Sequence, residues 1–237
     1  MKDIKSVWIL GSTSEIAKEI CYSLAKKGCK KFCLLARNKI KNEKFISKLK
    51  RNFSIEIESH VLDLQNKKTS TIHNIKDYDL YIISAGYLGS KNKVLNEELK
   101  IIDINFLSLI PWIKSIVTKK RITKKGALWI FSSVAGDRGR PSNYQYGAAK
   151  SALTIYCEGL AQICSDKPFS VRILKAGLIK TQMSRNTGPP FLFTSKKKIV
   201  EILLKNPYKN GVEYIPYWWS LIMTIIKFLP SFIIKKL

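Results

Sequence analysis

The sequence has few of the residues that hold metals or form disulfide frameworks. Its two histidines, His60 and His73, are too few and too scattered for metal chemistry. Its five cysteines are an odd number, and no Cys-x-x-Cys pair or histidine cluster accompanies them. This pattern indicates reduced thiols in a cytoplasmic protein rather than disulfides or a zinc site. We therefore expect no bound metal.

Acidic residues are scarce too. The chain has 17 Asp and Glu residues against 42 Lys and Arg residues, which gives a formal net charge of +25. Nucleic acid and an anionic membrane surface are the usual partners of so basic a chain. The lysines are spread along the sequence, which a general compositional bias toward lysine explains equally well. Because no helix-turn-helix, zinc-finger or aromatic-basic RNA motif is present, we expect no nucleic-acid partner.

The chain also lacks a secretory signal pattern and a long apolar run. Its N-terminus leads directly into an apolar strand, and no unbroken stretch reaches the ~18 apolar residues of a membrane-spanning helix. These absences predict a cytoplasmic protein. Hydrophobic residues nevertheless make up 46% of the 237 residues, enough for one full-sized core.

Short apolar runs alternate with amphipathic stretches along the sequence. The runs at 7–10, 32–36, 55–62, 80–83, 127–131 and 171–174 predict buried strands. The stretches at 16–26, 41–51, 97–119 and 146–164 predict helices, and Pro111 can kink the third of them. Such alternation predicts an α/β fold with a doubly wound, Rossmann-type parallel sheet and helices on both faces. We expect residues 1–211 to form this dinucleotide-binding and catalytic domain, and residues 212–237 to form an apolar helical tail.

The turn after the first strand is typical of a site for a dinucleotide pyrophosphate. It aims backbone N–H groups and the positive end of a helix at the phosphates. With a single glycine, the turn also suits an ordinary helix start capped by one of its hydroxyl residues. The residues of this turn are Gly11, Ser12, Thr13, Ser14, Glu15, Ile16 and Ala17.

The second strand ends without an acidic residue. An NAD-specific site usually places Asp or Glu there to hold the ribose 2′-hydroxyl, whereas this chain has Arg37. A guanidinium can pair with a 2′-phosphate through two charge-assisted hydrogen bonds, although a solvated surface arginine is the ordinary alternative. The pattern favours NADP(H) over NAD(H) as the cofactor.

Three residues with complementary chemistry follow the fifth strand. Ser133 lies at its end, Tyr146 comes 13 residues later, and Lys150 follows after four more. A separation of four places Tyr146 and Lys150 on one face of a helix. An unperturbed phenol is a poor acid or base at neutral pH, and a neighbouring ammonium favours the phenolate. The set therefore predicts proton transfer to a carbonyl oxygen that Ser133 holds in place.

In this order and on this βα frame, the residues resemble the short-chain dehydrogenase/reductase family over about the whole chain. The resemblance implies a cofactor-dependent ketone reductase that acts on a small molecule and assembles as a homo-oligomer. It also implies that Tyr146 is the general acid/base, that Lys150 holds the nicotinamide ribose and lowers the pKa of Tyr146, and that Ser133 orients the carbonyl. The matching positions are the glycine loop, Asp63, Ala85, Gly86, Asn105, Ser133, Tyr146, Lys150 and the segment from Gly177 to Thr181.

The same resemblance implies roles for residues outside the catalytic three. Asn105 would organise a proton-relay water near the catalytic lysine. Asp63, with Leu64 beside it, would face the adenine ring, and Ile179 and Thr181 would meet the nicotinamide carboxamide and the diphosphate. The remaining cofactor-binding positions would be Ala85, Gly86 and Gly177.

Three departures from the family pattern concern the cofactor. Ser84 stands where asparagine is common, Ala176 where proline is usual, and Glu15 and Ala17 where glycines are common. A Glu15 side chain directed at a pyrophosphate would repel it, so we expect this side chain to turn away.

A narrower resemblance concerns the substrate. Residues 13–16, residues 85–89 and the apolar tail are similar to reductases of the decaprenylphosphoryl-2-keto-ribose reductase type, whose loop also carries Glu at this position. This implies reduction of a keto-sugar on a polyprenyl phosphate carrier, in cell-envelope polysaccharide biosynthesis. A soluble reductase of a keto-acyl or nucleotide-sugar substrate and a non-catalytic dinucleotide-binding protein are the alternatives.

The tail from about residue 214 onward is apolar and aromatic. Its few polar residues recur at helical spacing on one narrow face, with tryptophans at one end and lysines at the other. This pattern suits a helix lying in a membrane interface, which would place the protein peripherally on the inner face of the cytoplasmic membrane. Burial against the core or a neighbouring subunit is the alternative. The polar positions are Ser220, Thr224, Lys227 and Ser231.

Overall fold

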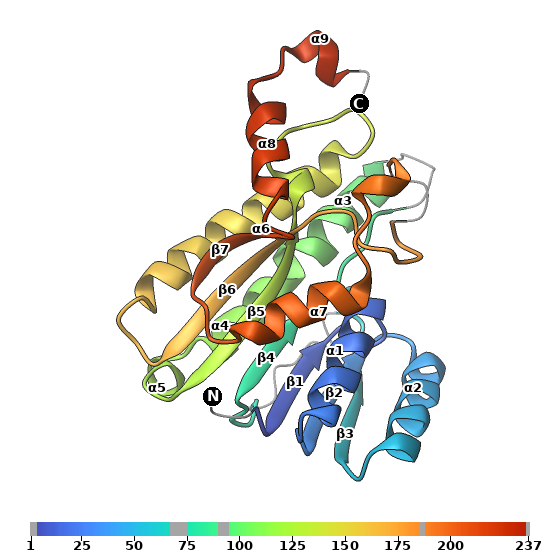
Figure 1. Cartoon of the computed structure of the whole chain (residues 1–237), viewed down its shortest axis with the longest axis vertical. Coiled ribbons are helices and arrows are strands. Elements are labelled where there is room, and N and C mark those ends of the chain that lie inside the picture. Colours follow the sequence, from blue (N-terminus) through green and yellow to red (C-terminus); the bar gives the residue numbers. More distant parts are fainter. Residues whose placement is uncertain (1–3, 67–74, 90–94, 185–187, 236–237) are drawn as a thin grey trace.

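A seven-stranded parallel sheet forms the centre of the computed structural model, which describes residues 4–66, 75–89, 95–184 and 188–235 (Figure 1). The strand order is β3-β2-β1-β4-β5-β6-β7, and every neighbouring pair is parallel. This is the predicted doubly wound α/β fold. The strands are β1 (Ser6–Leu10), β2 (Lys31–Ala36), β3 (Glu56–Val61), β4 (Leu80–Ile83), β5 (Gly126–Ser133), β6 (Phe169–Ala176) and β7 (Gly211–Ile215).

Helices cover both faces of the sheet, so the central strands are apolar on both sides. In β1, Val7 and Ile9 enter the core on one face of the sheet, while Trp8 and Leu10 enter the core on the other face. One face carries α1 (Glu15–Lys26), α2 (Lys39–Asn52) and α7 (Lys196–Lys205). The other carries α3 (Leu95–Asn105), α4 (Ile110–Ile116) and α6 (Tyr144–Ile163), with the short α5 (Lys119–Ile122) nearby (Figure 1).

The long helix predicted over 97–119 is divided. The helix α3 ends at Asn105, a 3₁₀ turn follows at Leu107–Leu109, and α4 starts at Ile110. Pro111 lies in the first turn of α4, where its missing N–H is not needed. Pro111 therefore begins a new helix instead of kinking a continuous one.

The C-terminal part contains elements that the sequence pattern did not reveal. The strand β7 brings residues 211–215 into the sheet, so the expected boundary between residues 211 and 212 falls inside a strand. The tail after it forms two helices, α8 (Trp219–Phe228) and α9 (Ser231–Ile234), which project beyond the sheet (Figure 1). Pro230 separates them, where one helix was expected. None of the helices in the described ranges is long and apolar enough to cross a membrane.

The carboxyl ends of β1 and β4 meet closely. Gly11 follows β1 with a φ of +91°, and a Cβ there would lie 2.5 Å from the backbone nitrogen of Ala85, just after β4. Only glycine fits this conformation and this approach. Because the strand order reverses between β1 and β4, this edge is where doubly wound sheets bind their ligands.

Candidate active site

Ser133, Tyr146 and Lys150 come together at this carboxyl edge, as predicted. Ser133 ends β5, and the other two lie one turn apart on α6. The Ser133 hydroxyl hydrogen-bonds the Tyr146 phenol, and Lys150 Nζ lies 5.7 Å from the centre of the Tyr146 ring. Lys150 Nζ donates a hydrogen bond to the Phe131 carbonyl oxygen at 2.9 Å. Hydroxyl, phenol and ammonium thus share one site.

Close contacts between β5 and α6 hold these groups in place. Ser132 Oγ donates to the Lys150 carbonyl oxygen at 3.1 Å and lies 2.6 Å from Thr154 Oγ1. A Cβ on Gly147 would come within 2.7 Å of the Ala135 carbonyl oxygen, so glycine at this position lets α6 pack against the segment after Ser133. The three side chains predicted to be catalytic therefore sit on closely packed elements.

Glu98 of α3 fixes the start of α6, a function that no sequence motif indicated. Its Oε1 accepts a hydrogen bond from the Tyr144 hydroxyl at 2.6 Å and another from Gln145 Nε2. Both donors directly precede Tyr146. Glu98 therefore orients the first turn of the helix that carries the phenol.

Burial shifts the two titratable groups in opposite directions. It raises the pKa of Tyr146 to about 12, against the smaller effect of the Ser133 hydrogen bond, which stabilises the phenolate. It lowers the pKa of Lys150 to about 8. The expected lowering of the Tyr146 pKa by Lys150 is thus not found, because loss of hydration of the phenolate dominates. At neutral pH the site holds a protonated phenol beside a largely charged ammonium.

Asn105 reaches this site through the loop after β4. Its Nδ2 donates to the carbonyl oxygens of Tyr87 at 2.6 Å and Ile101 at 2.8 Å, and its Oδ1 accepts the Tyr87 N–H at 3.1 Å. A Cβ on Gly86 would lie 3.1 Å from Asn105 Oδ1 and 3.8 Å from Lys150 Nζ. The Asn105 amide thus holds the loop beside Lys150, and its role with a relay water stays a prediction.

The predicted residues of the phosphate loop either cap α1 or anchor the loop to the rest of the fold. Ser14 is the N-cap of α1, and its hydroxyl accepts the Ala17 N–H at 3.2 Å. Ser12 is buried and donates to Asn42 Oδ1 at 2.8 Å and to the Leu35 carbonyl oxygen at 3.2 Å, so its hydroxyl holds the loop against β2 and α2. Ile16 packs in the core, while Thr13 is half-buried in the loop. The first turn of α1 supplies the N–H donors that a pyrophosphate needs.

Glu15 turns toward the segment that follows β6. Its Oε1 accepts the Gln182 N–H at 2.6 Å, and its Oε2 lies 2.5 Å from Lys196 Nζ. Burial raises the pKa of Glu15, but these two hydrogen bonds and the nearby lysine charges together hold it below its usual value. The charge that the sequence placed in the phosphate loop is therefore paired.

The residues expected at the adenosine half of a cofactor lie at the ends of β2 and β3. Arg37 follows β2 and is exposed. The hydrogen bond to Glu97 is the largest of the effects that raise the pKa of Tyr87, and the positive charge of Arg37 partly offsets them. Asp63 follows β3, and its carboxylate accepts the Gln65 N–H at 3.0 Å. Leu64 follows, with its carbonyl oxygen bonded to Ser108 Oγ at 3.0 Å.

The residues expected at the nicotinamide half follow β6. Ile179 is buried and forms an isolated parallel bridge with Thr194. The Thr181 hydroxyl lies 2.9 Å from the Ser184 hydroxyl, while the Gly177 N–H donates to the Ile215 carbonyl oxygen at 3.0 Å. The predicted cofactor positions thus gather along one edge of the sheet. A helix N-terminus, glycine contacts between strand ends and an arginine after β2 together fit a phosphate-bearing dinucleotide.

A family comparison agrees with this geometry. The model of the family described as short chain dehydrogenase matches residues 5–190. The chain belongs to the short-chain dehydrogenase family. The match spans the sheet through β6 and includes every predicted catalytic residue.

Individual relatives are distant. A 3-oxoacyl-[acyl-carrier-protein] reductase of Buchnera aphidicola subsp. Schizaphis graminum is 28% identical over 207 residues, which cover 85% of this chain and 83% of that protein. An uncharacterized oxidoreductase of Mycobacterium tuberculosis is 24% identical over 161 residues, or 66% of this chain. The chain covers 64% of that oxidoreductase, just under two thirds of its length.

Solved structures share the fold at lower identity. A short-chain dehydrogenase from Sphingobium yanoikuyae in complex with NADPH matches with a TM-score of 0.79 and 18% identity, covering 96% of this chain and 97% of that one. An actinorhodin polyketide ketoreductase variant with NADPH matches with a TM-score of 0.76 and 15% identity, over 92% of this chain and 98% of that one. Both likenesses concern the fold.

Asp137 links the tail of this short-chain dehydrogenase to the turn that follows Ser133. Its side chain is only 2% exposed, and it pairs with Lys175, with Lys227 of α8 at 3.8 Å and with the Tyr214 hydroxyl at 2.6 Å. Asp137 lies four residues after Ser133, on the turn that leaves β5. Sequence reasoning missed this residue, since the partners of an acid outside a motif are visible only in the fold.

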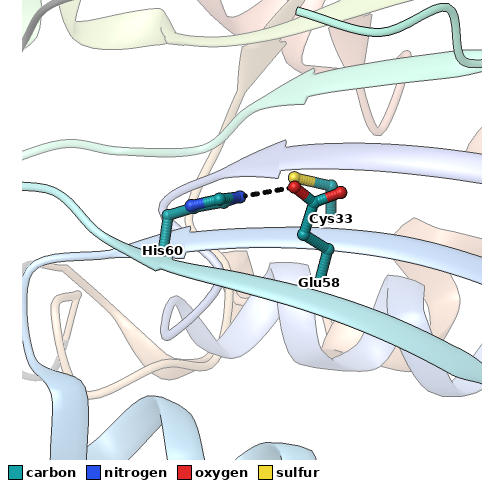
Figure 2. A group of neighbouring side chains, drawn as sticks. All are labelled: Cys33, Glu58 and His60. Carbon is teal, nitrogen blue, oxygen red and sulfur yellow. Dashed lines mark hydrogen bonds and ion pairs between the residues drawn. The ribbon is translucent and has the colours of Figure 1, made fainter. Parts of the chain in front are cut away.

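A separate polar cluster lies on the outer strands of the sheet. Figure 2 shows Cys33 of β2 beside Glu58 and His60 of β3, and the histidine ring lies 3.0 Å from the Glu58 carboxylate. His60 is therefore less isolated than the sequence suggested, while His73 lies outside the described residues. Lys76 Nζ also pairs with Glu58 at 3.0 Å, and burial raises the pKa of the Cys33 thiol to about 11. A protonated thiol is a poor metal ligand, and the carboxylate already has two partners.

Proposed function

We propose that the protein is an NADP(H)-dependent reductase that converts a ketone to a secondary alcohol. The arrangement of Ser133, Tyr146 and Lys150 is the observation that carries the proposal. When bound, the cofactor supplies the hydride. The protein supplies the proton and the orientation of the carbonyl group.

The protonation states of the site suit reduction. The Tyr146 phenol is protonated at neutral pH and can donate its proton to the substrate oxygen. Ser133 can hold that oxygen by a hydrogen bond, because its hydroxyl already lies beside the phenol. After the transfer, the charge of Lys150 stabilises the phenolate that remains. These three functions correspond to general acid, carbonyl positioning and electrostatic stabilisation.

The exposed Arg37 after β2 supports NADP(H) over NAD(H). No acid takes the place that would bind a ribose 2′-hydroxyl, and Asn38 after it caps α2 by accepting the Lys41 N–H at 2.8 Å. Two proteins of similar fold were solved with NADPH. Comparing the Kd of NADPH and NADH tests this part, and equal affinities would contradict it.

For the substrate, we infer a keto-sugar carried on a polyprenyl phosphate at the inner face of the cytoplasmic membrane. The support comes from α8, whose Trp219 and Met223 pack with Val134, the residue after Ser133. The opposite face exposes a stripe of large apolar side chains at helical spacing. These are Tyr217, Leu221, Ile225 and Phe228, with Phe232 of α9 continuing the stripe.

Such a stripe suits a membrane interface next to the site. Phe228 is 84% exposed and Leu221 is 67% exposed, so most of their apolar surface meets water in the free protein. Inserting a large apolar side chain is worth about 1–2 kcal/mol when it is partly exposed beforehand. The exposed Lys235 can add roughly 1 kcal/mol near anionic lipid. Reversible attachment would hold the active site where a lipid-linked sugar is displayed.

The tail gives a direct test of this substrate class. A variant with Leu221, Ile225 and Phe228 changed to Ser should lose binding to anionic vesicles by at least about 100-fold, since roughly 3–6 kcal/mol of apolar insertion is removed. Ile40→Ser, at an exposed residue of α2, is the matched control and should bind as the unmodified protein does. NADPH oxidation with a polyprenyl-linked keto-sugar should fall far more than with a water-soluble short-chain analogue. Equal losses on both substrates would contradict the membrane assignment.

A keto-acyl substrate is the second candidate, because the 28% identical relative is a 3-oxoacyl-[acyl-carrier-protein] reductase. A reductase of this kind would need no membrane, and its substrate would be soluble. Assaying NADPH oxidation against lipid-linked keto-sugars and 3-oxoacyl thioesters in parallel separates the two. Turnover of thioesters alone, without vesicle binding, would favour this candidate.

We also infer that the chain forms a homo-oligomer through α3 and α6, which contact each other. Their outer surfaces expose large apolar side chains that no described element covers. Changing Ile155 and Ile163 to Glu should yield monomers in light scattering, whereas an unchanged mass would exclude this interface. The exposed residues are Leu95, Leu99, Ile155 and Ile163.

A further inference from the structure

An acidic residue stands at the first position of α1, where the family fold presents its N–H groups to a pyrophosphate. Glu15 follows the N-cap Ser14 directly. Helix N-termini favour anions, so a carboxylate at this position stabilises the helix when no ligand is bound. In the presence of a bound pyrophosphate, the same carboxylate would face two further negative charges at short range. A free carboxylate at this point would oppose binding.

The structure pairs this carboxylate with one particular lysine. Lys196 Nζ lies 2.5 Å from Glu15 Oε2, and each side chain is about one third exposed, at 33% and 32%. Lys196 is the first residue of α7, whose N-cap Ser195 accepts the Lys198 N–H at 3.2 Å. Since α7 packs against α1, the ammonium is presented from a fixed element.

The other oxygen of Glu15 serves the segment after β6. Oε1 accepts the Gln182 N–H at 2.6 Å, one residue beyond Thr181. Thr181 belongs to the segment expected at the nicotinamide end of the cofactor. One carboxylate thus joins the phosphate loop to both α7 and this segment.

We propose that Lys196 is a charge-compensating residue of the cofactor site, which neutralises Glu15 so that a dinucleotide pyrophosphate can dock at the start of α1. Glu15, once neutralised, acts as a positioning residue that holds the segment at Gln182 against the same site. The proposal rests on the assignment of NADP(H) as the cofactor. It explains how a phosphate loop can carry an acid where its family commonly has glycine.

A double-mutant cycle on NADPH binding separates this function from that of an ordinary surface ion pair. Lys196→Met leaves the Glu15 carboxylate without its ion-pair partner beside the pyrophosphate and should raise the Kd of NADPH on the order of 10-fold. Glu15→Gln removes the charge, keeps an acceptor for the Gln182 N–H, and should bind NADPH at least as tightly as the unmodified protein. The double variant should recover to within about threefold of the unmodified Kd.

The neighbouring Lys197 provides the matched control. It is exposed on the same turn of α7, so Lys197→Met removes the same net charge without unpairing Glu15. Its Kd should stay within about twofold of the unmodified value. Raising the ionic strength should reduce the difference in NADPH Kd between Lys196→Met and the unmodified protein, because salt screens the repulsion between Glu15 and the pyrophosphate. Thermal unfolding of all variants checks that they are folded.

Each outcome decides one question. If Lys196→Met binds NADPH as Lys197→Met does, or if the double variant is as weak as Lys196→Met alone, charge compensation is wrong and the pair is structural. If the unmodified protein binds neither NADPH nor NADH, the proposed function fails first. The two failures are distinguishable because the second is seen before any variant is made.

Discussion

Replacing Lys150 by methionine should stabilise the folded protein at neutral pH while it abolishes turnover. The Lys150 side chain is 3% exposed, and burial lowers its pKa from 10.5 to about 8. Each pKa unit corresponds to about 1.4 kcal/mol, so the buried ammonium destabilises the folded state by roughly 3 kcal/mol at pH 7. Methionine has a similar length without the charge. It loses the hydrogen bond to Phe131, worth about 0.5–1.5 kcal/mol, which leaves a net stabilisation of about 2 kcal/mol.

The pH dependence identifies the cause. Below pH 8 the lysine is charged in both states, so the full penalty applies. Between pH 8 and 10.5 the unfolded chain binds the proton and the folded chain does not, so the stability of the unmodified protein rises with pH relative to the variant. The advantage of Lys150→Met should therefore shrink by about 2 kcal/mol between pH 7 and pH 9.5.

Urea unfolding of the two proteins across this range measures the difference directly, since the titration of all other groups is common to both. NADPH oxidation on the same samples should be undetectable for the variant. A variant that is less stable than the unmodified protein at pH 7, or a difference that does not change with pH, would show that Lys150 is not held at an energetic disadvantage.

Three further changes test other parts of the site. Tyr146→Phe removes the proton donor and should lower turnover by roughly 10²–10⁴-fold with an unchanged Kd for NADPH, so near-normal turnover would refute its role. Arg37→Asp should weaken NADPH binding by about 10-fold or more and spare NADH, as competitive binding can measure. Gly177→Ala should displace Trp219, because a Cβ there would lie 1.9 Å from the indole nitrogen, and a blue- or red-shifted tryptophan emission with loss of activity is expected. An unaltered spectrum and full activity would mean that α8 does not pack against Gly177 in solution.

The sheet could be predicted because its strands are buried on both faces and therefore read as continuous apolar runs. The six predicted strands include β1 and β4 within one residue at each end. The strand β7 was not predicted because its first four residues are only half-buried, so its sequence lacks a continuous apolar run. The break in the helix after Asn105 was also not predicted. The Asn105 side chain hydrogen-bonds the backbone of Tyr87, in a loop distant in sequence, and no local sequence pattern indicates that contact.

The placement of Ser133, Tyr146 and Lys150 at one edge of the sheet could be predicted because their spacing reflects a local geometry. One helical turn separates Tyr146 and Lys150, and β5 delivers Ser133 to the same edge. The direction in which the pKa of Tyr146 shifts could not be predicted, since it depends on how much water the fold removes from the phenol. The partners of Glu15 were equally hidden, because Lys196 is 181 residues away and is one of several lysines in its segment.

The segment after β6 joins the two unusual features of this chain. On one side Glu15 of the phosphate loop holds it at Gln182, and on the other Trp219 of the tail packs against Gly177. The phosphate loop and the apolar tail therefore contact opposite ends of one short stretch, residues 177–182. A tail that moved on reaching a lipid surface would shift Gly177, and a pyrophosphate that altered the Glu15 pair would shift Gln182. If lipid contact and cofactor binding are coupled through this stretch, anionic vesicles should change the Kd of NADPH for the unmodified protein, and the change should be smaller for the double variant of Glu15 and Lys196.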